Sequence, residues 1–433
     1  MDDLEGGMPP RNPMVRSQHM NSSSSRVANL VVSLLTSATL AAQAQSWVTV
    51  LDPAHGGPAG SSSDITTDTA GNLFAVGSTT QTTDGTMRAL VLGSGDAGAT
   101  WEVLDQYAEP GLNYAHNRAI ATNPLTGGLL AGGNLNHLLP DGSYQYGTLW
   151  FLREWNPTTG AWSVAEDATH LAGDIGQASC ADLLITPSGD VYATGGGDLG
   201  LIVRKRPAGG TAFATVHADY SGQKAGAGWD LGFHPVQGAF AVGDANSAWT
   251  VRRSTTGNAG TWAAVDTFKT SEWTVNTARS IVATRSGSLH VAGWGYSSKT
   301  RRNHWLVRSS YNGGATWSLS DTYSYGGTSV YVSGITEDLA GNLLVSGQVA
   351  DSAGNLWWLV RQGVPGTKRV KQGGKWVTVP TVSWTNSDLY RLASGQPARA
   401  LGLTVAPDGS AFASGWANDA AGAKQWIVRK LAP

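Results

Sequence analysis

The segment WEVLDQYA, residues 101–108, decides the fold because six similar segments recur along the chain. Each alternates apolar and polar residues, which predicts a β-strand. The other copies are WVTVLDPA from Trp47, WSVAEDAT from Trp162, ATVHADY from Ala214, WAAVDTFK from Trp262, WSLSDTYS from Trp317 and VSWTNSDLY from Val382. They are spaced by about 50 to 65 residues. This recurrence predicts a repeat fold with one structural unit per copy.

Between the copies the order of elements is constant. An alternating segment ends in a Gly turn, and a strand rich in Ala, Val and Gly follows, such as LFAVGS from Leu73. Next comes a strand that usually ends in Val-Arg, and the aromatic segment closes the unit. Four strands per unit in seven units predict an all-β fold, a single seven-bladed β-propeller of antiparallel strands spanning residues 46–433. A capped solenoid is the alternative.

The two ends of the chain fit together in this scheme. The last unit stops at WIVRKLAP, from Trp426, and lacks its fourth strand, whereas WVTVLDPA from Trp47 is a surplus copy. We expect Trp47–Leu51 to pair with Trp426–Arg429, to complete the last blade and to close the ring. Closure would remove two exposed strand edges.

Residues 1–45 predict a disordered start and a secretory signal peptide. Arg26 precedes the apolar run VANLVVSLLTSATLAAQAQ, and small residues end it near Ala44. The run is too short and too rich in Ser and Thr for a stable membrane span; a buried helix is the alternative. The expected mature protein is secreted or periplasmic, and lone Cys180 is expected to be a buried free thiol.

Composition excludes several classes of protein. Charged residues are 14% and the net charge is -2, which does not suit a nucleic-acid binder. One cysteine excludes an intramolecular disulfide and a Cys-rich zinc site. Asp and His do not cluster at metal-ligand spacing, so no metal site or cofactor is expected, although a calcium ion on the ligand face stays open. The expected state is a monomer without nucleic acid or membrane partners.

Two turns carry a recognisable motif. Residues 94–101 read Ser-x-Asp-x-Gly-x-Thr-Trp, and residues 310–317 read the same with Asn in place of Asp. The motif resembles the Asp-box, or BNR repeat, of sialidase-like propellers. The resemblance implies that Asp96 and Asn312 hold a structural turn on the face away from the ligand. A second recurring feature is the Val-Arg arginine, which is predicted to be scaffold because almost every unit has one: Arg153, Arg204, Arg252, Arg308, Arg361 and Arg429.

The ligand site is expected at the mouth of the central channel, where the innermost strands begin. The candidate substrate-binding residues there are Arg118, Asn117, Arg279, Arg399, Trp229, Trp273, Tyr220 and Tyr331. Three arginines aimed at one mouth would bind a carboxylate. Sialidases use three arginines in this way, but their Arg-Ile-Pro segment and Tyr-Glu pair are missing, so sialidase activity is not expected.

His116 and His137 flank one predicted hairpin and are expected on the same rim. This arrangement resembles that of BNR-type propeller polysaccharide lyases, such as ulvan lyases. The resemblance covers the His pair only, because the lyase Tyr position falls near Cys180. It implies a His base and an acid from Tyr114 or Tyr144, with activity rising as a His of pKa about 6.5 deprotonates.

Other readings of these residues stay open. The two histidines could be rim residues without chemistry. Cys180 could be a nucleophile beside His116, provided that its thiol pKa is lowered. The predicted function is therefore a polysaccharide lyase or glycoside hydrolase for an acidic glycan. The alternative is a non-catalytic propeller that binds glycan or protein through the same face.

Overall fold

The computed structural model describes residues 46–80, 83–137, 139, 148–166, 178–197, 200–219 and 226–433. The chain divides into two units, Met1–Gln43 and Ala44–Pro433, and the described residues belong to the second. The predicted signal peptide lies outside them. No helix among the described residues is long and apolar enough to cross a bilayer.

The described chain is almost entirely β-structure, with one short 3-10 helix, η1 (Pro53–His55). The strands are β1 (Val48–Leu51), β2 (Gly60–Thr67), β3 (Leu73–Thr79), β4 (Ala89–Ser94), β5 (Glu102–Tyr107), β6 (Tyr114–Thr122), β7 (Leu129–Asn136), β8 (Leu149–Asn156), β9 (Ala161–Glu166), β10 (Ala178–Ile185), β11 (Val191–Gly197), β12 (Gly200–Arg206), β13 (Ala214–Ala218), β14 (Ala227–His234), β15 (Gly238–Ala245), β16 (Ala248–Ser254), β17 (Ala263–Phe268), β18 (Trp273–Ala283), β19 (Leu289–Ser297), β20 (Arg302–Ser310), β21 (Ser318–Tyr323), β22 (Val330–Glu337), β23 (Leu343–Ala350), β24 (Leu356–Gln372), β25 (Lys375–Tyr390), β26 (Ala398–Val405), β27 (Ala411–Asn418) and β28 (Lys424–Leu431).

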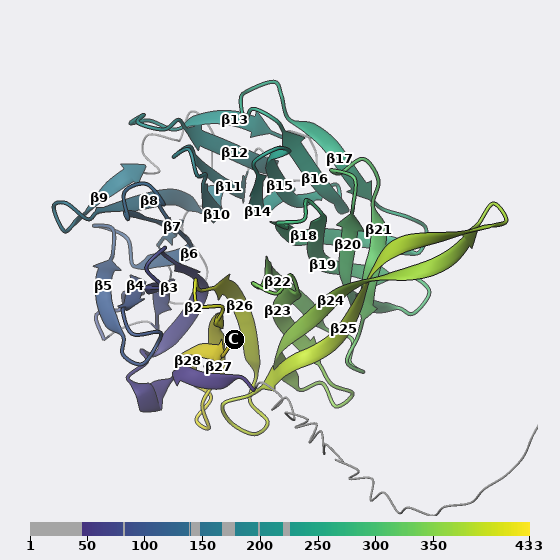
Figure 1. Cartoon of the computed structure of the whole chain (residues 1–433). Coiled ribbons are helices and arrows are strands. Elements are labelled where there is room, and N and C mark those ends of the chain that lie inside the picture. Colours follow the sequence, from purple (N-terminus) through teal and green to yellow (C-terminus); the bar gives the residue numbers. More distant parts are fainter. Residues whose placement is uncertain are drawn as a thin grey trace, which may run out of the picture. The chain divides into compact units, whose positions relative to one another are not determined.

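These strands form antiparallel groups of four, which we call blades. β2–β5, β6–β9, β18–β21 and β22–β25 are separate four-stranded sheets. The groups β10–β13 and β14–β17 share one sheet through a single pair, Gly196↔Ala227. The first strand of each group is the inner strand, and the inner strands surround a central channel (Figure 1). Successive inner strands contact one another in chain order, and β2 contacts both β6 and β26.

The N-terminal strand completes the sheet of the C-terminal strands, in the order β1-β28-β27-β26. Val48 pairs with Lys430 and Thr49 with Arg429, which is the pairing predicted from the missing fourth strand. The indole Nε1 of Trp47 also donates to Ser387 Oγ at 2.9 Å, so the start of the described chain is tied to the neighbouring blade as well.

Tryptophans of the third strands fill the spaces between blades. Trp150, Trp249, Trp305, Trp358 and Trp426 are fully buried. The first four of these rings lie against a glycine on the second strand of the next blade. A Cβ at Gly293, for example, would lie only 2.5 Å from Trp249 Cζ3. A Cβ at this position would also meet a carbonyl oxygen of the inner strand of the same blade, at 1.9 Å from Ser61 O in the case of Gly77, so these close approaches favour Gly in the second strand.

The Val-Arg arginines tie each blade to the one before it. Each pairs with the acidic residue that ends the preceding aromatic segment, as the scaffold prediction requires: Arg153–Asp105, Arg204–Glu166, Arg252–Asp219, Arg308–Asp266, Arg361–Asp321 and Arg429–Asp388. Four of the guanidinium groups also lie over an aromatic ring of the same segment, which adds a cation–π contact.

The junction between β1 and the first blade departs from this pattern. Leu92 occupies the arginine position, two residues before the turn serine Ser94. Leu51 occupies the acidic position, because it pairs with Val428 as Asp105 pairs with Val91. Both leucines are buried in the same apolar cluster. An apolar contact therefore stands where the other junctions have an ion pair.

The two motif turns have the same hydrogen-bond pattern. Asp96 Oδ1 accepts from the Thr100 amide at 2.8 Å, and the Ser94 hydroxyl accepts from the Gly98 amide at 2.9 Å. In the second turn, Asn312 Oδ1 accepts from the Thr316 amide at 2.9 Å. Neither turn lines the channel cavity described below, which agrees with a structural role.

One feature was not predicted from the sequence. β24 and β25 are 17 and 16 residues long and continue beyond their blade as a two-stranded arm (Figure 1). Gly373 and Gly374 form its tip, with φ values of 55° and 84°. Two successive positive φ angles define a type I′ hairpin turn, for which Gly-Gly is a favoured sequence.

Candidate functional site

A cavity of about 930 Å³ occupies the central channel, and residues of all inner strands line it. Each inner strand contains a β-bulge, where the pairing with its neighbour slips by one residue or more. A bulge redirects a side chain that regular alternation would place elsewhere. The bulge residues that line the cavity are Ser63, Arg118, Ala181, Trp229, Arg279, Ser333 and Leu401.

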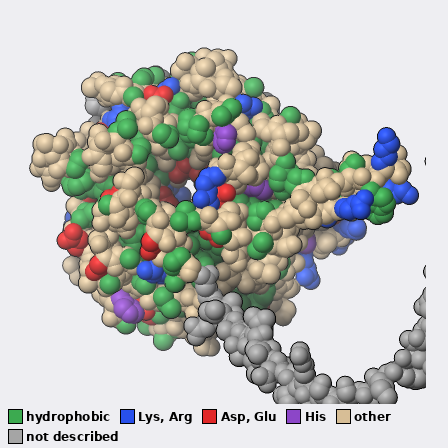
Figure 2. Space-filling view, viewed as in Figure 1, with side chains coloured by type: hydrophobic (Ala, Val, Ile, Leu, Met, Phe, Trp, Pro, Cys, Tyr) green, Lys and Arg blue, Asp and Glu red, His purple; other side chains and the backbone are tan. Residues whose placement is uncertain are grey.

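Four cationic side chains gather in this cavity: Arg118, Arg279, Arg399 and Lys424. They come from β6, β18, β26 and β28, so residues far apart in sequence meet at one place. Figure 2 shows Lys and Arg side chains beside the opening at the centre of the molecule. The structure thus brings the three predicted carboxylate-binding arginines together and adds a lysine.

Each of these four cationic side chains contacts an uncharged side chain. Arg279 Cζ lies 3.8 Å from the ring centroid of Trp229, and Lys424 Nζ lies 4.5 Å from that of Trp416. Arg399 Cζ lies 4.6 Å from the ring centroid of Tyr331. Arg118 Nε donates to Asn134 Oδ1 at 2.9 Å. Within the described residues, none of the four is part of an ion pair, and Arg399 Nε is buried without a hydrogen-bond partner.

The positive charges in the cavity are poorly compensated. Burial, together with the charges of Arg399 and Arg118, lowers the pKa of Arg279 to about 9. Burial lowers the pKa of Arg399 to about 10, and Arg118 contributes in the same direction. Burial and the charge of Arg399 also lower the pKa of Lys424. An anion bound among them would relieve this repulsion.

His116 lines the same cavity and is held by two serines. Its Nε2 lies 2.8 Å from Ser63 Oγ, its Nδ1 lies 2.8 Å from Ser78 Oγ, and the ring of Tyr114 stacks on it at 6.3 Å. Burial and the nearby charges of Arg118 and Lys424 lower the pKa of His116 to about 3. The expectation of a titration near 6.5 is therefore corrected, because an imidazolium is unfavourable beside these cations.

His137 does not line this cavity. It follows the last strand pair, Tyr114↔Asn136, whereas His116 opposes Asn134. The two histidines are thus separated by three residues along the hairpin, roughly 10 Å at 3.3 Å per residue. Because successive side chains of a strand alternate between the two faces of the sheet, the two histidines also belong to opposite faces. The structure does not bring the two histidines together on one rim, as the lyase resemblance implied.

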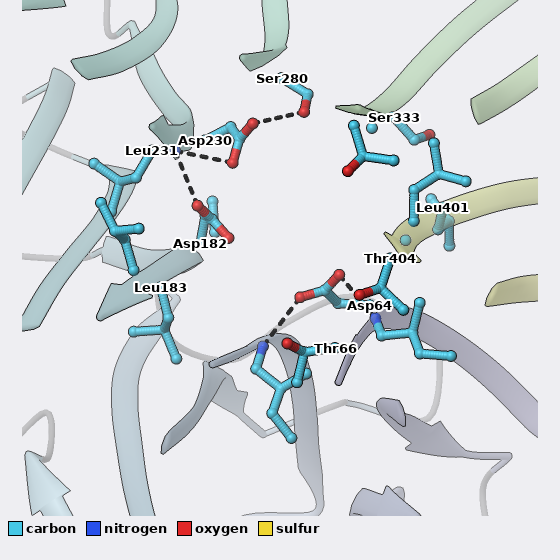
Figure 3. Close-up of a pocket in the computed structure, with 18 of the residues that line it drawn as sticks. Asp64, Thr66, Asp182, Leu183, Asp230, Leu231, Ser280, Ser333, Leu401 and Thr404 are labelled. Carbon is cyan, nitrogen blue, oxygen red and sulfur yellow. Dashed lines mark hydrogen bonds between the residues drawn. The ribbon is translucent and has the colours of Figure 1, made fainter. Parts of the chain in front are cut away.

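Three half-buried aspartates line the cavity and join neighbouring blades (Figure 3). The Asp64 carboxylate accepts from the Ile120 amide of the next blade at 3.1 Å. Asp182 accepts from the Leu231 amide at 2.9 Å, and Asp230 accepts from that of Ile281 at 2.7 Å. Each carboxylate therefore holds the adjacent inner strand in register.

These aspartates are easily protonated. Burial raises the pKa of Asp64 to about 7. Burial and the neighbouring charge of Asp230 raise the pKa of Asp182, and burial raises that of Asp230. Asp182 and Asp230 lie close enough for each carboxyl group to affect the pKa of the other. Among the described residues, no group of three or more His, Cys, Asp or Glu side chains is placed to bind a metal ion.

Several predicted site residues lie elsewhere. Asn117 is 1% exposed and donates to the Leu90 carbonyl, and Trp273 is 8% exposed and packs in the core, so both predictions of rim positions are wrong. Tyr331 is exposed and does not line the cavity. Its ring contacts the guanidinium group of Arg399, which does line the cavity. Tyr144 and Tyr220 lie outside the described residues.

Cys180 is fully buried, as expected, but it does not line the cavity. Burial raises the pKa of its thiol, so the thiolate needed for a nucleophile is disfavoured. The environment of Cys180 therefore opposes the role of a nucleophile beside His116.

The positions of Asp64, Asp182 and Lys424 in the cavity, and the blade-joining role of the aspartates, were not predicted from the sequence. The aspartates had a detectable signal, because Asp-Ile or Asp-Leu stands at the same position of three units, at Asp64, Asp182 and Asp230. Lys424 had none, since it starts a third strand, two residues before Trp426, and only the fold turns it toward the channel.

Comparisons with known proteins support the fold but do not identify a function. No protein-family model and no curated protein sequence matches the chain. The chain is similar to the solved structure of an ancestral GH74 enzyme, with 12% identity, a TM-score of 0.51, and coverage of 87% of this chain and 48% of that one. A Hadza microbial sialidase is 11% identical, with a TM-score of 0.42 over 89% of this chain and 68% of its own.

A leech intramolecular trans-sialidase, solved with 2,7-anhydro-Neu5Ac, is also 11% identical, with a TM-score of 0.42 over 90% of this chain and 68% of its own. At 12% identity, the likeness to the GH74 enzyme shows the fold alone. The class defined by the fold is thus an all-β propeller of four-stranded antiparallel sheets.

Proposed function

We propose that this protein is a secreted, seven-bladed β-propeller that binds an anionic glycan at the cationic mouth of its central cavity. Support for the blade number comes from the strand groups, since β1 with β26–β28 makes a seventh group beside β2–β25. The contact of β2 with both β6 and β26 supports a closed ring. The apolar run at residues 27–45 supports export.

One observation carries the ligand class: Arg118, Arg279, Arg399 and Lys424 share a cavity without a carboxylate partner among the described residues. Arg279 and Arg399 are half-buried and Arg118 and Lys424 are exposed, and the like charges lower the pKa of Arg279, so an anion bound among these side chains is favourable. Planar guanidinium groups bind a carboxylate with paired hydrogen bonds. Trp229 and Trp416 add aromatic faces against which a sugar ring can pack.

Binding without turnover fits the cavity better than hydrolysis does. Glycoside hydrolysis uses two carboxyl groups, one as an acid and the other as a base or nucleophile. The carboxylates lining the described cavity are Asp64, Asp182 and Asp230, and all three accept hydrogen bonds from backbone amides that hold the blades. A lyase role for His116 remains a prediction, and its lowered pKa makes it a weak base.

The proposal is tested by calorimetric titration with an oligomer of uronic acid. Arg399→Gln and Lys424→Gln should each weaken binding about tenfold, because a charge-assisted hydrogen bond contributes about 1.5–3 kcal/mol. Lys299→Gln is the matched control, since Lys299 is exposed and does not line the cavity. Equal affinity for all three variants and the unaltered protein would overturn the proposal. Release of reducing ends or unsaturated sugars would show that the site also catalyses cleavage.

A further inference from the structure

The arm formed by β24 and β25 carries a charge unlike that of the rest of the chain. Residues 362–387 contain four Lys or Arg residues and no Asp or Glu, whereas the whole chain has a net charge of -2. The arm therefore carries +4 and the remainder -6. Lys368, Arg369, Lys371 and Lys375 are all exposed.

The arm stands at a place where other blades have a short turn. In the first blade, seven residues separate β4 from Glu102 of β5 and form the aspartate turn, whereas in this blade both strands run on beyond the sheet. From Val364 to Gln372 the ribbon extends by roughly 30 Å at 3.3 Å per residue. An isolated two-stranded ribbon is only marginally stable in water, so its residues are not explained by core packing.

One face of the arm combines cations with an aromatic ring. Lys371 pairs directly with Trp376, and Arg369 pairs with Thr378, so Arg369, Lys371 and Trp376 share a face. Arg369 Cζ lies 5.6 Å from the Trp376 ring centroid. Trp376 is 61% exposed, whereas every other tryptophan of this chain is buried or half-buried. Lys368 and Lys375 fall on the opposite face, beside valines.

We propose that the face formed by Arg369, Lys371 and Trp376 is a second binding site, for a linear anionic polysaccharide. The cations would pair with carboxylate or sulfate groups, and the exposed indole would pack against the apolar face of a sugar ring. Charge complementarity argues for this occupant, because the ribbon lacks any acidic residue over its whole length. The inference does not depend on the cavity, because no residue of the arm lines it.

The test uses the full mature chain with polygalacturonate as the long probe and its disaccharide as the short one. Arg369→Gln combined with Lys371→Gln, and separately Trp376→Ala, should weaken binding of the long chain about tenfold. Affinity should also become less dependent on salt concentration in the double variant. Lys368→Gln combined with Lys375→Gln removes the same charge from the opposite face and is expected to change affinity less than twofold.

The outcomes separate this inference from the cavity proposal. Unchanged disaccharide binding by the arm variants, with weakened polymer binding, supports a distinct site on the arm. Equal losses in the two double variants would mean non-specific charge attraction and would overturn it. The inference also fails if polymer binding is unaffected while the arm variants lose binding to anionic lipid vesicles, or lose a self-association seen by sedimentation.

Discussion

The two motif turns place different residues, Ala97 and Gly313, at a position where the backbone φ angle is positive. Ala97 has a φ of 57°, and the equivalent residue of the second turn, Gly313, has a φ of 70°. An L-residue in this left-handed region is strained by about 1–2 kcal/mol, whereas glycine is not. The first turn therefore carries a local cost that the second turn avoids.

We predict that Ala97→Gly raises the free energy of unfolding by about 0.5–1 kcal/mol, after the greater entropy of glycine in the unfolded chain is deducted. The reverse change, Gly313→Ala, should lower it by a similar amount, because a Cβ there meets no atom closer than 3.8 Å and only the φ angle matters. Urea unfolding of both variants is the measurement. Destabilisation by Ala97→Gly would contradict this account of the turn.

The charge state of His116 gives a prediction about pH. Its folded-state pKa of about 3 lies below the unfolded value of 6.5, so protons bind the unfolded chain more strongly. The stabilising contribution of neutral His116 is complete above pH about 6.5 and is lost as the pH falls toward 3. Ring proton shifts of His116 in an NMR titration should stay constant from pH 5 to 8. A midpoint between pH 6 and 7 would restore it as a candidate base.

At the level of elements, the blades are joined by repeated arginine–carboxylate pairs, and one junction replaces this pair with Leu51 and Leu92. A buried ion pair and a well-packed apolar pair of similar size differ little in their contribution to stability. A single buried charge without its partner, in contrast, costs about 3–5 kcal/mol.

We therefore predict strong coupling between these two positions. Leu51→Asp and Leu92→Arg should each destabilise the protein by about 3–5 kcal/mol, and the double variant should recover at least about 2 kcal/mol of the summed loss. The measurement is a double-mutant cycle of unfolding free energies. Additive losses would show that the two positions do not correspond to the paired positions of the other junctions.

Much of the element order was predictable, but side-chain direction in the inner strands was not. The repeats predicted the strand order, the pairing of the N-terminal strand and the scaffold role of the arginines. The bulges leave no mark in the sequence, and they decide that Arg118 lines the cavity while Asn117 is buried. Trp273 was misplaced because β18 begins earlier than its repeat suggests. The arm could have been predicted, because Gly373-Gly374 between two alternating segments is typical of a β-hairpin turn.

For the whole molecule, the pairing of β1 with β28 makes the two ends interdependent. Removal of residues 46–52 should lower the free energy of unfolding by several kcal/mol, since it exposes the edge of β28 and removes fully buried Leu51. The control is the chain that starts at residue 46. A synthetic peptide of residues 46–52 should restore part of the lost thermal stability by adding back the strand. A truncated chain that melts at the same temperature as the control would contradict this role.

The central claim is that the channel cavity recognises the negative charge of a glycan. The most direct measurement is a calorimetric titration of the protein with a uronic acid oligosaccharide and with the same oligosaccharide after reduction of its carboxyl groups to alcohols. The account predicts that the acidic form binds and that the reduced form binds at least about a hundredfold more weakly, since the charge-assisted hydrogen bonds to the cations of the cavity are lost. Equal binding of the two forms, or binding of neither, would contradict it.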